Sequence, residues 1–184
     1  MSFRELRWAP VLVILTLTVG LLMGANSFYH RAYIDTPMKR IMDAHPEVKS
    51  WSLDKEGKQN TLTVKLGTVD NLLETCTIIQ KEVEPYLGKD GWQMRVTDER
   101  SDDLEQVFYS MQYVVYEALT QGNFTFLADT LKREAARAGL DSSAIYVNSY
   151  NLYIQMKKDG VSLYEVLPRK VDDKPPVLII GGSE

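Results

Sequence analysis

The segment VKSWSLDKEGKQNTLTVKLG, residues 48–67, decides the fold of the first half of this chain. Apolar and polar residues alternate on both sides of its centre, and this period of two places every second side chain on one face of a strand. Gly57 lies in the polar centre, which favours a turn. The segment therefore predicts a β-hairpin whose inner face carries Trp51, Leu53, Leu62, Val64 and Leu66.

Helical patterns flank this hairpin. Thr36 and Pro37 suit the first positions of a short helix before it. A second helix is predicted after Val69, from apolar residues at helical spacing: Leu72, Cys76, Ile79 and Val83. The alternating segment WQMRVT, residues 92–97, predicts a third strand, so residues 30–98 are expected to form an α-β-β-α-β lobe.

A second lobe is predicted over residues 99–168. Ser101 suits a helix N-cap and Gly122 a helix end, and Asn123 and Gly139 bound a second helix in the same way. Three short β-prone segments follow, SAIYV, NLYIQMK and VSLYEVL, separated by turn residues. The order α-α-β-β-β places the whole chain in the α+β class.

Residues 37–97, which begin PMKRIMDAHPEV, resemble two groups of α-β-β-α-β domains: the BON domains of bacterial envelope proteins, and the ring-building domains of secretion and sporulation machines. The resemblance rests on the short helix, on HPEV before the first strand, and on VKLGTV, where Gly67 precedes the second helix. The polar hairpin turn is longer than that of a minimal BON hairpin. The resemblance implies an envelope domain that associates with itself or contacts lipid, and it implies no enzyme activity.

The N-terminal region predicts a membrane anchor. After a short flank, residues 1–7, the apolar segment over residues 8–29 is long enough to cross a bilayer as a helix. Trp8, Phe28 and Tyr29 are expected to lie at the two interfaces, where aromatic residues are enriched. We therefore expect a single-pass protein in contact with the lipid bilayer.

Two questions about this segment stay open from sequence. Arg4 and Arg7 with the small residues Ala25 and Ser27 also fit a cleaved signal peptide, although the apolar stretch is longer than usual for one. Basic residues lie on both sides of the segment, and a short basic N-terminus favours an extracytoplasmic position for the lobes.

Composition and motifs point away from several function classes. The formal charge of −4 lacks the basic excess that nucleic-acid binding requires, so we expect no nucleic-acid partner. Cys76 is the only cysteine, and the only histidines are His30 at the expected membrane interface and His45 beside a proline. No nucleophile elbow, Walker A or dinucleotide motif is present. We therefore expect no catalytic, metal or cofactor-binding residues, and no enzyme.

Candidate interaction residues come from three places. Tyr109, Tyr113 and Tyr116 line one side of the helix after Ser101, where burial against the next helix is favoured and a partner site is the alternative. Lys65 points away from the apolar face of the hairpin, and we select it as a residue for self-association.

The third place is the C-terminal linker and tail, residues 169–184. It ends in a short apolar run of Val177, Leu178, Ile179 and Ile180. This run can add as an edge strand to its own sheet or a partner's, or remain a disordered terminus.

These features predict a membrane-anchored, non-enzymatic interaction or assembly protein of the cell envelope. Its expected partner is itself, through the α-β-β-α-β lobe, or another envelope protein. The alternative is a membrane-tethered module that senses a small molecule or a lipid, with the aromatic helix and nearby strands enclosing a cavity.

Overall fold

A computed structural model describes residues 14–21, 35–56, 59–169 and 178–181. The chain divides into two compact units, residues 1–40 and residues 41–184. Its helices and strands confirm the α+β class.

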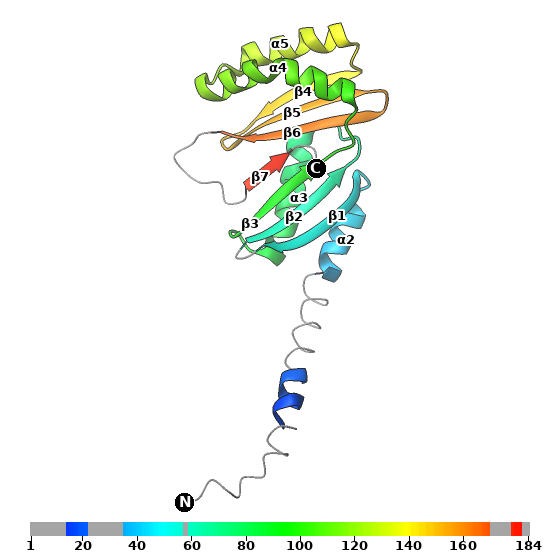
Figure 1. Cartoon of the computed structure of the whole chain (residues 1–184), viewed down its shortest axis with the longest axis vertical. Helices are drawn as coiled ribbons and strands as arrows, with labels where there is room; N and C mark the ends of the chain where they lie inside the picture. The colour runs from blue at the N-terminus through cyan, green and yellow to red at the C-terminus, as the bar shows by residue number, and fades with distance from the viewer. Residues whose placement is uncertain (1–13, 22–34, 57–58, 170–177, 182–184) are drawn as a thin grey trace, which may run out of the picture. The chain divides into compact units, whose positions relative to one another are not determined.

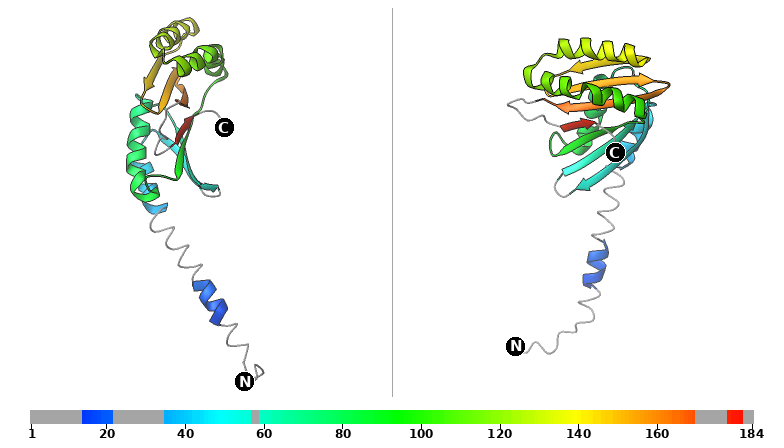
Figure 2. Two further views of the ribbon diagram at one scale, coloured as in Figure 1. Left: turned by 90° about the vertical axis from the view of Figure 1, so that its left-hand side faces the viewer. Right: turned by 45° about the horizontal axis from the view of Figure 1, so that its top comes forward.

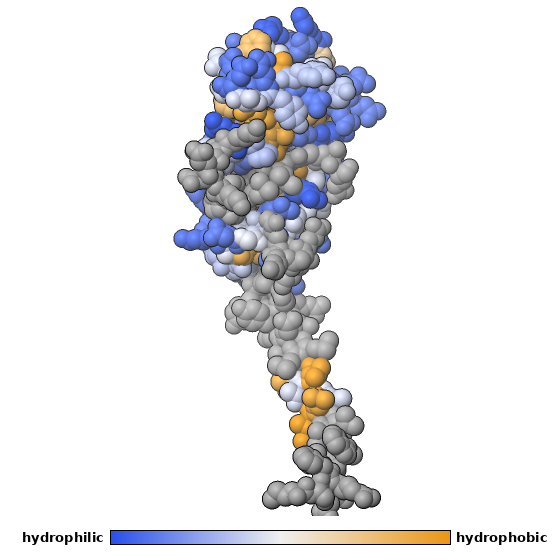
Figure 3. Space-filling model, turned by 60° about the vertical axis from the view of Figure 1, so that its left-hand side comes forward, coloured by the Kyte–Doolittle hydropathy of each residue, from blue (hydrophilic) through white to orange (hydrophobic). Residues whose placement is uncertain are grey.

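The first unit contains a helix over residues 14–21. Its apolar side chains, including Ile14, Leu17 and Leu21, are exposed (Figure 3). In the described part of the chain, no helix is both long and apolar enough to cross a membrane.

This finding corrects the predicted anchor over residues 8–29, and with it the predicted single-pass localisation and extracytoplasmic domain. The predicted interfacial residues Trp8, Phe28 and Tyr29 lie outside the described residues.

The second unit begins within α2 (Thr36–Ala44) and contains two sheets (Figure 1). In the first sheet, with strand order β1-β2-β3-β7, β1 and β2 are antiparallel and β3 runs parallel to β2. Trp51 lies opposite Val64 and Leu53 opposite Leu62, so the predicted hairpin is confirmed and these residues share a face as expected. Gly57 lies outside the described residues. The strands are β1 (Val48–Glu56), β2 (Gln59–Leu66), β3 (Trp92–Thr97) and β7 (Leu178–Gly181).

Helix α3 (Leu72–Leu87) connects β2 to β3, since parallel strands need a crossover of this kind. The Asn71 side chain caps it by accepting the Glu74 N–H at 3.1 Å, and Gly88 ends it with a positive φ. Its buried face carries the predicted residues Leu72, Cys76, Ile79 and Val83.

The second sheet has the order β4-β5-β6, all antiparallel. Two helices cover one of its faces (Figure 2), and their predicted caps Ser101 and Asn123 each accept a backbone N–H of the first turn. The elements are α4 (Asp102–Gln121), α5 (Phe124–Ala138), β4 (Ser142–Val147), β5 (Asn151–Lys158) and β6 (Val161–Pro168).

Strands β5 and β6 are buried on both faces. Leu152, Ile154, Met156 and Leu163 face α4 and α5, in one core with residues such as Met111, Val115, Leu127 and Leu131. Alternate residues such as Gln155 and Tyr164 turn the other way, toward the loop between β2 and α3. The two predicted lobes therefore share the second sheet as a middle layer and form one compact unit.

The C-terminal tail contributes β7. It runs parallel to β3, with Gln93 opposite Leu178 and Val96 opposite Gly181, and β6 lies beside it (Figure 1). Of the three alternatives left open by the sequence, the structure shows the edge strand of the protein's own sheet. Val177 lies outside the described residues.

Candidate functional site

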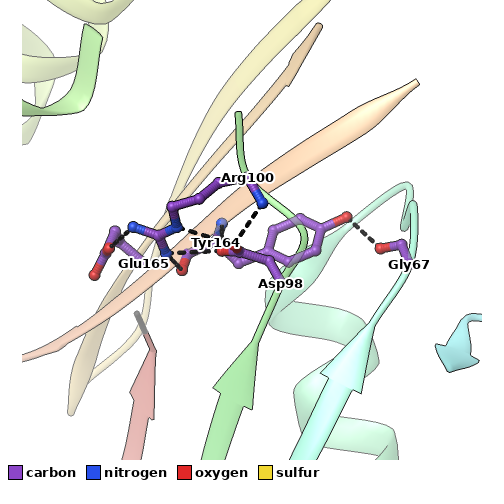
Figure 4. A network of polar contacts seen from close by, with 5 residues as sticks. All are labelled: Gly67, Asp98, Arg100, Tyr164 and Glu165. Atoms are coloured by element: carbon purple, nitrogen blue, oxygen red, sulfur yellow. Dashed lines mark hydrogen bonds and ion pairs between the residues drawn. The ribbon is translucent and has the colours of Figure 1, made fainter. Parts of the chain in front are cut away.

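Three buried charged side chains, Asp98, Arg100 and Glu165, join the segment after β3 to strand β6 (Figure 4). This cluster is called here the fork. Arg100 donates from Nε and Nη2 to the two carboxylate oxygens of Asp98, at 2.9 and 2.8 Å, and from Nη1 to Glu165 Oε1 at 2.7 Å. The three side chains are only 10% (Arg100), 1% (Asp98) and 9% (Glu165) exposed. The bidentate geometry makes this a strong and directional contact.

The same fork closes the outer edge of β6. The Tyr164 N–H donates to Asp98 Oδ2 at 2.7 Å, and the Tyr164 carbonyl accepts from Arg100 Nη2 at 3.3 Å. Such groups on an edge strand would otherwise be open to pairing with another chain. Asp98 and Arg100 therefore take the place of a neighbouring strand along this part of β6.

Side chains of the second sheet also hold the loop between β2 and α3. The Tyr164 hydroxyl donates to the Gly67 carbonyl at 2.7 Å and accepts the Val69 N–H at 3.0 Å. Gln155 accepts the Leu72 N–H at 3.0 Å and donates to the Val69 carbonyl at 2.8 Å. Buried backbone groups need partners, and here the partners come from strands distant in sequence.

The electrostatics of the fork favour a structural role. Burial raises the pKa of the Glu165 carboxyl, and the hydrogen bond from Arg100 offsets only part of that rise. Burial alone would lower the pKa of the Arg100 guanidinium, but the hydrogen bonds to Asp98 and Glu165 outweigh it and raise the pKa. A catalytic acid or base must reach a proton of its substrate, whereas these groups are buried and bonded to one another.

His45 bridges two carboxylates at the end of α2. Its Nδ1 lies 3.1 Å from Glu47 Oε1 and its Nε2 lies 2.9 Å from Glu82 Oε2 of α3. Burial alone would lower the pKa of His45, but the hydrogen bonds and charges of Glu82 and Glu47 outweigh it and raise the pKa. The imidazole links the end of α2 to α3, so it is not freely solvated.

We expect His45 to stabilise the fold at acidic pH and to lose this effect as the pH rises through its raised folded-state pKa. The folded state binds the proton more tightly than the unfolded state, so protonation favours folding. The Tm of the wild type should exceed that of His45→Gln near about pH 6 and approach it by about pH 8. A Tm difference that stays constant over this range would contradict the assignment.

Tyr109, Tyr113 and Tyr116 form an exposed row along α4, called here the tyrosine row. Their side chains are 73%, 87% and 55% exposed, respectively. The favoured prediction, burial of this side against α5, is wrong. Helix α4 instead contacts α5 and the sheet through its other side, which carries Leu104, Met111, Val115 and Ala118.

The other candidate residues lie elsewhere. Lys65 is on β2, where its Nζ forms an ion pair with Glu99 Oε1 at 3.1 Å, and both side chains are exposed. Leu178, Ile179 and Ile180 belong to β7, on the far edge of that sheet from β1. The structure therefore does not bring the three sets of candidate residues into one site.

Sequence reasoning missed the buried fork and the loop contacts. The available signal for these contacts was a charged or amide residue within a β-prone segment: Glu165 in VSLYEVL and Gln155 in NLYIQMK. A buried polar side chain implies a partner, but the sequence does not say which. No group of three or more His, Cys, Asp or Glu in the described ranges is placed to hold a metal.

Comparison of the chain with protein-family models, with curated proteins and with solved structures finds no match. The resemblance of residues 37–97 to BON and ring-building domains therefore stays a prediction.

Proposed function

We propose that this chain is a non-enzymatic interaction module that assembles with proteins through the tyrosine row of α4. The observation that carries the proposal is the exposure of Tyr109, Tyr113 and Tyr116 in one line on a helix whose opposite side is fixed in the core. Tyrosine is enriched at protein interfaces because its ring offers apolar contact area and its hydroxyl a hydrogen bond.

The setting of the row supports this function. Its spacing of four and then three residues keeps all three rings on one face of α4. Ser101 and Gly122 cap the helix at its two ends, so the backbone that carries the rings is well supported. A tyrosine has few side-chain torsions, so a row of them on a well-supported helix loses little conformational entropy on binding, which favours affinity.

Site-specific photo-crosslinking tests the proposal. We expect p-benzoylphenylalanine at Tyr113, in the full-length chain in the cells that make it, to give an adduct of discrete mass on irradiation. The same label at Lys81, an exposed position on α3, should give none. Adding Tyr109→Ser and Tyr116→Ser should lower the adduct yield at least about tenfold, since interface tyrosines commonly contribute about 2 kcal/mol.

The mass of the adduct separates self-association from binding to a different protein. Equal yields at Tyr113 and Lys81, or a yield at Tyr113 that is insensitive to the two serine substitutions, would contradict the proposal.

A further inference from the structure

Strand β4 is an open edge of the second sheet. It pairs with β5 on one side, and no strand in the described residues pairs with its other side. The Asn148 N–H donates to the Asn151 carbonyl of β5 at 3.0 Å, so by alternation Ser143, Ile145 and Val147 direct their N–H and C=O groups away from β5. Groups in this geometry fit the backbone of another extended strand.

The other sheet edges are either covered or carry charges that discourage pairing with another strand, and β4 has neither feature. The fork closes the outer edge of β6, and β6 in turn lies beside β7. Strand β1 carries exposed charges at Lys49 and Asp54. Strand β4, with the sequence SSAIYV, has no charge, proline or glycine that would discourage pairing.

Space for a neighbour exists beside this edge. A groove of about 500 Å³ runs between α5 and β4. Ala128, Ala135 and Ala136 form much of its helical wall, and Ser143 and Ile145 lie along its strand wall. Small residues on the helix leave room for the side chains of an added strand.

We propose that β4 pairs with β4 of a second copy of this chain, antiparallel across a two-fold axis, so that their three-stranded sheets become one continuous sheet. Closed two-fold dimers are the commonest oligomers, and an antiparallel pair of identical strands has this symmetry. Self-pairing of β4 also places no like charges opposite each other, because the strand is uncharged. This inference does not depend on the tyrosine row.

The hydrogen-bonding pattern restricts the register. Residues that face outward must lie opposite residues that face outward. Among the registers that satisfy this we choose the one centred on Ile145, with Ile145 opposite its own copy and Ser143 opposite Val147 of the second copy. In the same register Asp141, just before β4, lies opposite the uncharged Ser149 of the second copy.

Two matched double variants of the full-length chain test this register. In Ser143→Lys/Val147→Lys, like charges lie opposite each other at both symmetric positions, whereas in Ser143→Glu/Val147→Lys opposite charges do. In one copy Ser143 is half-buried and Val147 is 37% exposed, so the folded monomer should tolerate either pair, which circular dichroism can verify.

Sedimentation equilibrium measures the outcome. We expect the wild type to reach twice the 21.0 kDa mass of one chain as concentration rises. The lysine pair should raise the dissociation constant at least about tenfold, and the mixed pair should keep it within about threefold of the wild type. A wild type that stays monomeric, or a dimer that responds equally to both variants, would overturn the inference while leaving the Tyr113 crosslink unaffected.

Discussion

Replacing Arg100 with methionine is expected to lower the free energy of unfolding by about 3–5 kcal/mol. The substitution keeps an unbranched side chain about as long as the stem of arginine but removes the guanidinium. Asp98 and Glu165 then remain buried without their opposite charge, and the Tyr164 carbonyl loses a donor. Because small folded domains have stabilities of about 5–15 kcal/mol, this loss is a large fraction of the total. Urea denaturation of the full-length chain measures it.

The matched control is Lys65→Met, which removes an ion pair between exposed side chains. Such pairs contribute about 0–1 kcal/mol, so the control should unfold at nearly the wild-type urea concentration. If Arg100→Met lowered stability no more than Lys65→Met, the fork would be dispensable and its structural role would be refuted.

Replacing Tyr164 with phenylalanine is expected to destabilise the protein by about 2–4 kcal/mol, although only one oxygen atom is lost. That oxygen bonds both the Gly67 carbonyl and the Val69 N–H, and each would be left without this partner in a buried place. The loop between β2 and α3 should loosen as well. Hydrogen exchange at Val69 is therefore expected to accelerate, in addition to the lower midpoint in urea.

Tyr153→Phe is the control for this change. Tyr153 is as buried as Tyr164, but its hydroxyl accepts only the long contacts from Asn148 and Asn151, at 3.3 and 3.4 Å. We expect a loss of less than about 1 kcal/mol there and no change at Val69. Equal effects of the two substitutions would show that the Tyr164 hydroxyl does not hold the loop.

The contacts of Arg100, Tyr164 and Gln155 with neighbouring segments also bear on the proposed function. The fork and the Tyr164 and Gln155 contacts tie the second sheet to the segment after β3 and to the loop between β2 and α3. The tyrosine row and the open edge of β4 both belong to the layers built on that sheet. Both surfaces are therefore carried by a fixed scaffold, which lowers the entropic cost of binding a partner.

The sequence by itself determined the local elements. Alternation specified which hairpin residues share a face, among them Trp51 and Val64, because a slip of one residue would turn the apolar face outward. Helix ends followed from Ser101, Gly122 and Asn123, whose caps act within a few residues of themselves. The apolar N-terminal stretch was different, because composition alone suggested a span that no helix of the described residues provides.

The tertiary structure alone decided which surfaces are open and which are closed. Whether the side of α4 that carries Tyr113 is buried depends on where α5 packs, and the sequence is compatible with either arrangement. The pairing of the C-terminal strand with β3, and the meeting of Arg100 with Glu165, join segments far apart in the chain. Such contacts depend on the packing of whole layers, and local periodicity carries no information about them.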